Sequence, residues 1–158
     1  MEVDRYERIW LLGSAVFILT AVAAIISSVV FHTAELPTPA GRIEPELVSS
    51  TAPFDEPGLH QRDDGSWELI YVGQAWAWTP QEVVIPAEAR GEEITIKSTT
   101  LDVIHGMKIT DTNVNIMLIP GQISEVDVTF DEEGTHTLIC HEYCGIQHHV
   151  MGAQIIVE

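Results

Sequence analysis

Residues 135–157 read THTLICHEYCGIQHHVMGAQIIV. Two β-rich runs in this stretch flank a segment that is dense in cysteine, histidine and methionine. The first run ends at Ile139, and the second run occupies residues 154–157. We therefore predict that the segment between them is a loop joining two strands at one end of a β structure.

Six further β-rich runs precede this stretch and begin after Trp67. They are ELIYVG (68–73), EVVIPA (82–87), EITIKST (93–99), HGMKIT (105–110), VNIMLIP (114–120) and ISEVDVTF (123–130). Several of them alternate apolar with polar residues, and turn signals such as Pro120-Gly121 separate them. Seven or eight short strands at this spacing predict an antiparallel sandwich or a Greek-key barrel. We expect one such mainly β domain, at residues 67–158.

A long apolar run occupies residues 9–31, IWLLGSAVFILTAVAAIISSVVF, and contains no charged side chain. At a helical rise of about 1.5 Å per residue it spans roughly 34 Å, which is enough to cross the hydrocarbon core of a membrane. A cleaved signal peptide would have a shorter apolar core, of about 7–15 residues. Its N-terminal flank would also be basic, whereas MEVDRYER mixes acids with arginines. We predict a retained transmembrane helix at residues 9–31.

The orientation of this helix follows from the basic residues on its two sides. Arg5 and Arg8 lie just before the span, and the nearest base after it is Arg42. The positive-inside rule then places residues 1–8 in the cytoplasm and the C-terminal domain on the outer, extracellular or periplasmic, face of the cell membrane. The chain is expected to cross the membrane once.

Residues 32–66 are predicted to connect the helix to the domain. Five of the eight prolines fall in this stretch, and proline lacks the N–H donor that a helix or a central strand needs. We expect an extended linker, with one helical turn at residues 46–50.

The charge balance is strongly acidic, with 24 Asp and Glu against 7 Lys and Arg and a formal net charge of −17. Nucleic acid is excluded as a partner, because phosphate binding needs Lys and Arg. The acids could steer a basic partner, or they could act as a solubility device like that of proteins from high-salt organisms. The low lysine count and the even scatter of the acids favour this halophile-like interpretation.

The loop between the last two strands carries a soft ligand set. Cys140, Cys144, His148 and Met151 supply two thiols, an imidazole and a thioether within twelve residues. Such ligands select copper(I), zinc or iron–sulfur clusters, and the methionine argues for copper. A disulfide between the two cysteines would not explain the histidine and the methionine at those offsets. His105, in the string DVIHG at residues 102–106, is the natural ligand from a neighbouring loop.

A mononuclear blue-copper site is a close alternative, because it needs one Cys, two His and one weak Met. Cys144, His148, Met151 and His105 would satisfy it. The additional thiol of Cys140 speaks against this interpretation. Two bridging thiolates can hold two copper ions close together and share one electron between them, which lowers the reorganisation that each electron transfer requires.

The string C-x-E-x-C-G-x-x-H-x-x-M at residues 140–151 resembles the CuA signature of the cytochrome oxidase subunit II family. This resemblance extends over the whole chain and implies a cupredoxin-like Greek-key domain behind an N-terminal membrane anchor. The single span and the DVIHG string are similar to the B-type oxidases. The resemblance implies a CuA centre of two copper ions, with ligands at Cys140, Cys144, His105, Met151, His148 and the backbone carbonyl of Glu142.

Within that ligand set, Cys140 and Cys144 would bridge the two ions, and the spacing favours His148 over its neighbour His149. The side chain of Glu142 is left open as a ligand of a magnesium ion shared with subunit I. The resemblance also implies that Trp76 and Trp78 belong to an aromatic cluster that admits electrons from the donor. They alternate along a predicted strand and are expected to point to one face, where core packing is their alternative role.

The function implied by the resemblance is an electron relay. A soluble donor, cytochrome c or a blue-copper protein, would reduce the copper centre, and the electron would pass to haem in subunit I, where oxygen is reduced to water. This chain would carry electrons only, and enzyme status would belong to the complex. Two alternatives stay open, namely a CuA subunit of a nitric-oxide reductase and a membrane-tethered copper carrier. The length of the chain excludes nitrous-oxide reductase, which is much larger.

Overall fold

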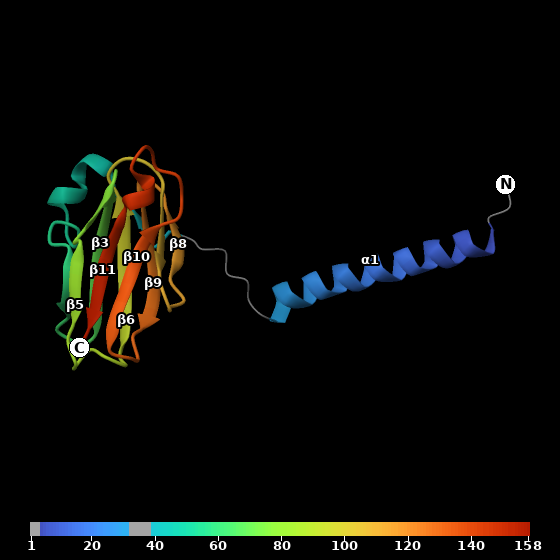
Figure 1. The fold of residues 1–158 in the computed structure, drawn as a ribbon, viewed down its shortest axis with the longest axis horizontal. Helices are drawn as coiled ribbons and strands as arrows, with labels where there is room; N and C mark the ends of the chain where they lie inside the picture. Colours follow the sequence, from blue (N-terminus) through green and yellow to red (C-terminus); the bar gives the residue numbers. More distant parts are fainter. Residues whose placement is uncertain (1–3, 32–38) are drawn as a thin grey trace. The chain divides into compact units, whose positions relative to one another are not determined.

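The computed structural model describes residues 4–31 and 39–158, and they form two separate units (Figure 1). The first contains the helix α1 (Arg5–Phe31), and the second is a β sandwich that begins at Pro39. Part of the expected linker, residues 32–38, lies outside the described residues, as do residues 1–3.

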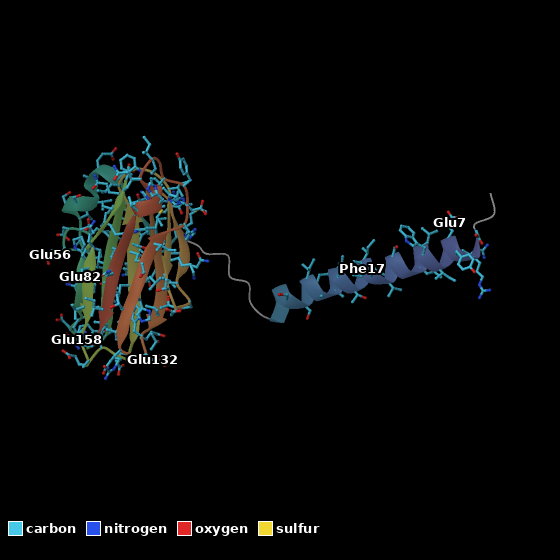
Figure 2. The ribbon with its side chains drawn as sticks, in the orientation of Figure 1. Glu7, Phe17, Glu56, Glu82, Glu132 and Glu158 are labelled. Carbon is cyan, nitrogen blue, oxygen red and sulfur yellow. The ribbon has the colours of Figure 1, made fainter. Side chains whose placement is uncertain are left out.

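The helix α1 presents apolar side chains all around its surface. Leu12 is 68% exposed and Phe17 is 75% exposed, and Figure 2 shows Phe17 projecting away from the helix axis. A helix that is apolar on every side is typical of a membrane span or of the core of a large protein. Among residues 4–31 and 39–158, α1 is the one helix that is long and apolar enough to cross a membrane, with a candidate span at Arg5–Ser28.

The second unit consists of two sheets that pack face to face. The first sheet has the strand order β1-β9-β6-β3-β2, with β4 paired to β3, and the second has the order β5-β11-β10-β7-β8. The strands are β1 (Gly41–Arg42), β2 (Gly58–Gln61), β3 (Trp67–Gln74), β4 (Ala77–Thr79), β5 (Glu82–Ile85), β6 (Glu93–Thr100), β7 (His105–Ile109), β8 (Asn115–Leu118), β9 (Gln122–Thr129), β10 (Gly134–Cys140) and β11 (Gly152–Val157). All eight runs expected as strands are strands, so the mainly β prediction is confirmed.

Most strand pairs of the sandwich are antiparallel, as the sequence indicates, but two pairs are parallel. β3 pairs with β6 in parallel, and β5 pairs with β11 in parallel. Parallel neighbours need a crossover connection. After β3 and β4 the chain passes to the second sheet at β5 and returns to the first sheet at β6. This exchange between the sheets produces both parallel pairs.

The main core lies between the two sheets and is made of alternate residues of the central strands. From β3 it takes Leu69 and Tyr71, and from β10 it takes Leu138. The other face of β3 is buried as well, because Ile70 and Val72 pack in a second cluster with Val48 and Phe54. β3 is therefore covered on both faces, which explains why its sequence, WELIYVG, does not alternate.

The prediction that residues 32–66 form an extended linker is wrong for residues 39–66. These residues contain β1, the 3-10 helix η1 (Pro45–Ser50) and β2, and they belong to the sandwich unit. β1 pairs with β9, and β2 pairs with β3. The physical reason is the second apolar face of β3, which would be exposed to water if these residues were a free connection.

Most of the acidic residues lie on the outside of the sandwich, whereas Glu68 is only 8% exposed and pairs with Arg62 and Lys97. Figure 2 shows the side chains of Glu56, Glu82, Glu132 and Glu158 pointing outward from four separate places, and all four are exposed. The scatter that the sequence indicated is therefore also a scatter in space.

The second core cluster predicts that residues 39–66 contribute to stability. Phe54→Ala removes a side chain that is only 2% exposed and should lower the free energy of unfolding by about 3–5 kcal/mol. Leu47→Ala in η1 is the matched control, because that side chain is 54% exposed and its loss should change the free energy by less than about 0.5 kcal/mol. Denaturant unfolding measures both, and equal effects would contradict the assignment of this segment to the folded unit.

Candidate metal centre

Two backbone hydrogen bonds close the loop that follows β10. The Cys140 N–H donates to the carbonyl of Met151 at 3.1 Å, which ties the two ends of the loop together. The His141 N–H donates to the carbonyl of Gly106 at 3.1 Å, which ties the loop to β7. β7 itself begins at His105. These bonds bring three ligand-bearing segments to one end of the sandwich.

The three sulfur atoms of the loop lie close together. The Sγ of Cys140 is 3.7 Å from the Sγ of Cys144, and the Sγ of Cys144 is 3.6 Å from the Sδ of Met151. All three side chains are at most 8% exposed, and both cysteines are free thiols. The thiols are therefore neighbours that have not formed a disulfide, so both are available as ligands.

Two imidazoles lie on either side of the sulfur cluster. The Nδ1 of His105 is 3.8 Å from the Sγ of Cys140, and the Nδ1 of His148 is 3.6 Å from the Sγ of Cys144. His105 is completely buried, whereas His148 is half-buried at the start of the 3-10 helix η2 (His148–Val150). His149, the next residue, is exposed. The structure thus brings His148, and not His149, to the sulfur atoms.

The sixth residue expected as a ligand, Glu142, contributes its backbone to this cluster. Its carbonyl oxygen accepts a hydrogen bond from the thiol of Cys140 at 3.2 Å. Its side chain is 42% exposed, and one carboxylate oxygen lies 3.5 Å from the Nδ1 of His141. The two ends of this residue therefore have separate environments, one at the sulfur cluster and one at the surface.

The donor set fits copper. The ligand atoms of His105, Cys140 and Cys144 all lie within 4.8 Å of one another. Thiolate, thioether and imidazole are the ligands that copper prefers, and a thioether is unusual for zinc. These residues therefore form a candidate copper site.

A family model described as cytochrome c oxidase subunit II, periplasmic domain, matches residues 70–158. This chain belongs to the cytochrome c oxidase subunit II family. As a member of that family it is part of an oxidoreductase complex, and membership implies copper.

Individual relatives agree with this family. Cytochrome c oxidase subunit 2 of Thermus thermophilus is 32% identical over 158 residues, which cover 97% of this chain and 92% of that protein. A chain of a haem–copper terminal oxidase dimer solved by cryo-electron microscopy has a TM-score of 0.69 at 30% identity and covers 98% of this chain and 100% of that chain. Nitrous-oxide reductase of Stutzerimonas stutzeri is 27% identical over 101 residues, but these are 15% of that protein.

The fold has a solved counterpart in the periplasmic domain of subunit II of cytochrome oxidase from Bradyrhizobium japonicum. Its TM-score is 0.52 at 24% identity, and the match covers 58% of this chain and 83% of that chain. This likeness concerns the fold alone, and it confirms the expected cupredoxin-like sandwich. Together with α1, the match to a periplasmic domain indicates a membrane-anchored subunit II with an outer domain.

The environment of this subunit II site keeps the thiol of Cys144 protonated in the metal-free protein. Burial, together with the smaller effect of the neighbouring Cys140, raises the pKa of the Cys144 thiol to about 11. A thiol is a metal ligand in its deprotonated form, so metal binding must displace its proton. A bound metal ion would supply the positive charge that buried thiolates need.

The two tryptophans do not share a strand as expected. Trp76 lies in the turn between β3 and β4, while Trp78 lies on β4. Trp78 is 1% exposed, and its ring packs edge-on against that of His105 at a centroid distance of 6.0 Å. Trp76 is half-buried, and its Nε1–H donates to the carbonyl of Cys144 at 3.0 Å. Both rings thus adjoin the site, but only Trp76 reaches the surface.

Two residues near the site were missed from the sequence. Asp102 accepts a hydrogen bond from the Nε2–H of His105 at 3.0 Å. Burial raises the pKa of Asp102, but hydrogen bonds from the Ala75 N–H, the His105 ring and the Val103 N–H outweigh it and leave the pKa lowered. The sequence offered one signal for this residue, namely its position three residues before His105.

Gly145 is the second missed residue. It has a φ of +122°, and a Cβ at this position would lie 2.8 Å from the Nε1 of Trp76. Glycine is therefore required twice, once by the backbone and once by the close approach of the indole. Its signal in the sequence is its place directly after Cys144.

These contacts of Gly145 predict a local effect on the site. Gly145→Ala should lower the free energy of unfolding by about 1–3 kcal/mol through backbone strain, displace Trp76 and weaken copper retention. Gly134→Ala is the control, because Gly134 has a φ of +149° and nothing within 4 Å of the added Cβ. Thermal unfolding should show a lower stability for both variants. Tryptophan fluorescence and copper retention against a chelator should change for Gly145→Ala alone, and unchanged copper retention would contradict the packing role.

Proposed function

We propose that this chain is the electron-accepting subunit of a haem–copper terminal oxidase and holds a dinuclear CuA centre. The observation that carries the proposal is the placement of two free thiols 3.7 Å apart between two imidazoles, in a chain of the subunit II family. A mononuclear site would leave one of the two thiols without a role. Two thiols in this position are suited to bridge two copper ions.

In this proposal each ligand has its own part. Cys140 and Cys144 would hold both copper ions, His105 and Met151 would serve one of them, and His148 and the Glu142 carbonyl would serve the other. His105 lies 3.8 Å from the sulfur of Cys140 and His148 lies 3.6 Å from that of Cys144, which supports assigning the two imidazoles to different copper ions. The bound copper pair supplies a one-electron relay from a soluble donor, cytochrome c or a blue-copper protein, to haem in subunit I, where oxygen is reduced to water.

The protein contributes rigidity to this relay. Cys140 ends β10, Met151 directly precedes β11, and His105 begins β7, so three of the ligands are fixed by sheet hydrogen bonds. The remaining ligands lie in a loop whose ends are bonded to each other. A ligand set that cannot move far keeps the rearrangement between oxidation states small, which is the requirement for fast electron transfer.

The membrane arrangement is also part of the proposal. Residues 9–31 would cross the cell membrane, with residues 1–8 in the cytoplasm and the sandwich on the outer face. Arg5 and Arg8 before the span support this orientation. The exposed carboxylate of Glu142 would then be available as a ligand of a magnesium ion at the interface with subunit I.

A membrane-tethered copper carrier is not favoured. Such a protein must release its metal to another protein, and its ligands are best kept exposed and few in number. Here His105, Cys140, Cys144 and Met151 are all at most 8% exposed. The burial of four donors suits a resident metal.

The bridging role of the thiols predicts the copper content of the protein. The full-length chain, purified in detergent under copper-replete reducing conditions, should bind two copper ions and turn purple. Electron paramagnetic resonance should show one unpaired electron shared over both nuclei. Cys140→Ser should abolish that sharing and leave at most one copper ion per chain. A wild-type chain with a single copper ion, or with a Cys–Cys bond under these conditions, would refute the dinuclear centre.

The two neighbouring histidines provide a matched pair for the same assay. His148→Ala should destroy the shared-electron spectrum, because its Nδ1 lies 3.6 Å from the Sγ of Cys144. His149→Ala should leave the spectrum nearly intact, because that side chain is exposed. The reverse result would show that the wrong histidine has been assigned.

Trp76 is expected to be the aromatic side chain that admits electrons. It reaches the surface and its indole contacts the Cys144 carbonyl, whereas Trp78 lies in the core. Trp76→Ala should slow reduction of the copper centre by the donor in stopped-flow measurements and leave most of the optical spectrum unchanged. Reduction at the wild-type rate would remove Trp76 from the electron path.

A further inference from the structure

The carboxylate of Asp102 occupies the point where the segments of the copper site meet. It lies between β6 and β7, and its Oδ1 accepts hydrogen bonds from the Nε2–H of His105 at 3.0 Å and from the Val103 N–H at 2.7 Å. The hydroxyl of Thr100 is 3.3 Å from the same oxygen. The other oxygen, Oδ2, accepts from the Ala75 N–H at 2.7 Å. Both oxygens of one side chain are thus engaged with two different segments.

The first of these contacts determines which ring nitrogen of His105 carries the proton. A carboxylate can only accept, so the Nε2 of His105 must donate. In a neutral imidazole the Nδ1 is then left with a lone pair. That Nδ1 is the atom that lies 3.8 Å from the Sγ of Cys140. Asp102 therefore turns the free nitrogen toward the sulfur cluster in the metal-free protein.

The second contact reaches the other side of the site. Ala75 and Trp76 form the turn between β3 and β4, and Trp76 donates its Nε1–H to the carbonyl of Cys144 at 3.0 Å. A chain of hydrogen bonds therefore runs from His105 through Asp102 and the turn to Cys144. It connects a ligand on β7 with a ligand in the loop after β10 without passing through the metal.

We propose that Asp102 is a positioning residue of the copper centre, which sets the tautomer of His105 and holds the turn of Trp76 against the Cys144 loop. The copper-dependent part of this inference rests on the proposed function. The tautomer part concerns the metal-free chain and stands by itself. A carboxylate that accepts a hydrogen bond from a ligating imidazole also makes that imidazole a stronger donor, which favours the oxidised state of the metal.

A purely structural role is the competing explanation, because Asp102 also caps its own turn through Val103 and Thr100. A structural role would lower the unfolding temperature and nothing else. A positioning role must in addition change the protonation of His105 and the properties of the bound copper. The experiment therefore needs readouts of both kinds.

The test compares Asp102→Asn with a matched control, Asp64→Asn, in the full-length chain in detergent. Asp64 also lies in a turn and accepts hydrogen bonds from the Ser66 N–H at 3.0 Å and the Ser66 hydroxyl at 2.7 Å, but it is remote from the ligands in the sequence and in their hydrogen-bond network. Nitrogen-15 magnetic resonance of histidine-labelled, metal-free protein reads the tautomer of His105. Competition with a copper chelator measures the copper affinity, and redox titration measures the reduction potential of the copper-loaded protein.

In the wild type and in Asp64→Asn, the His105 proton should reside on Nε2. In Asp102→Asn this preference should be lost, the apparent copper affinity should fall by about 10- to 100-fold, and the reduction potential should rise. A wild-type His105 with its proton on Nδ1 would overturn the proposal without any variant, even if Asp102→Asn did not fold. A folded Asp102→Asn with wild-type tautomer, affinity and potential would overturn it as well.

Failure of the proposed function has a different signature. If the wild-type chain bound no copper pair, the dinuclear assignment would fall, while the tautomer of metal-free His105 would still decide whether Asp102 positions the ring. A wild-type chain that binds two copper ions, with an Asp102→Asn variant that matches it in every readout, would refute the positioning role alone.

Discussion

The site depends on the hydrogen bond that joins the two ends of its loop, from the Cys140 N–H to the Met151 carbonyl. β10 and β11 are antiparallel neighbours paired from Gly134↔Val157 to Ile139↔Gly152. This register brings Cys140, the last residue of β10, opposite Met151, the residue before β11. The ten residues between them must then fold back within a small volume. A slip of the register by one residue would turn Cys140 from the core side to the solvent side and separate the sulfur atoms.

The core of the sandwich forms the walls of the site. Cys140, Cys144 and Met151 belong to the same buried cluster as Leu138 and Met107, so the ligands are packed as core residues on one side and reach a loop on the other. This arrangement keeps water from the thiols, which is why burial raises the pKa of Cys144. The polar contacts of the site are hydrogen bonds, from His105 to Asp102 and from Trp76 to the Cys144 carbonyl. The site therefore combines an apolar wall that excludes water with a polar network that orients donors.

Burial of both faces of β3 links the fold to this network. Leu69 and Tyr71 face the core between the sheets, while Ile70 and Val72 face the segment at residues 39–66. β3 is thereby held in the interior, and it leads directly into the turn that carries Ala75 and Trp76. The segment that was expected to be a linker thus helps to fix the position of the turn beside the candidate copper ligands.

The sequence by itself was sufficient for the strands, the apolar helix and the cluster of candidate ligands in the loop. Hydrophobic alternation and turn residues are local signals, and the soft side chains at residues 140–151 lie within a few residues of one another, so no knowledge of the tertiary structure is needed to group them. Even His105 could be named, because its position in the DVIHG string is a family signal.

Contacts between distant segments were decided by the tertiary structure alone. The parallel pairs of β3 with β6 and of β5 with β11 depend on a chain that changes sheets, which no local pattern encodes. The same holds for the covering of β3 by residues 39–66 and for the separate environments of Trp76 and Trp78. The contact of Asp102 with Ala75, 27 residues away in the sequence, exists because sheet pairing brings the ends of β3 and β6 together. The residue types of a site can be recognised from the local sequence, but the orientation of their side chains depends on which strands become neighbours.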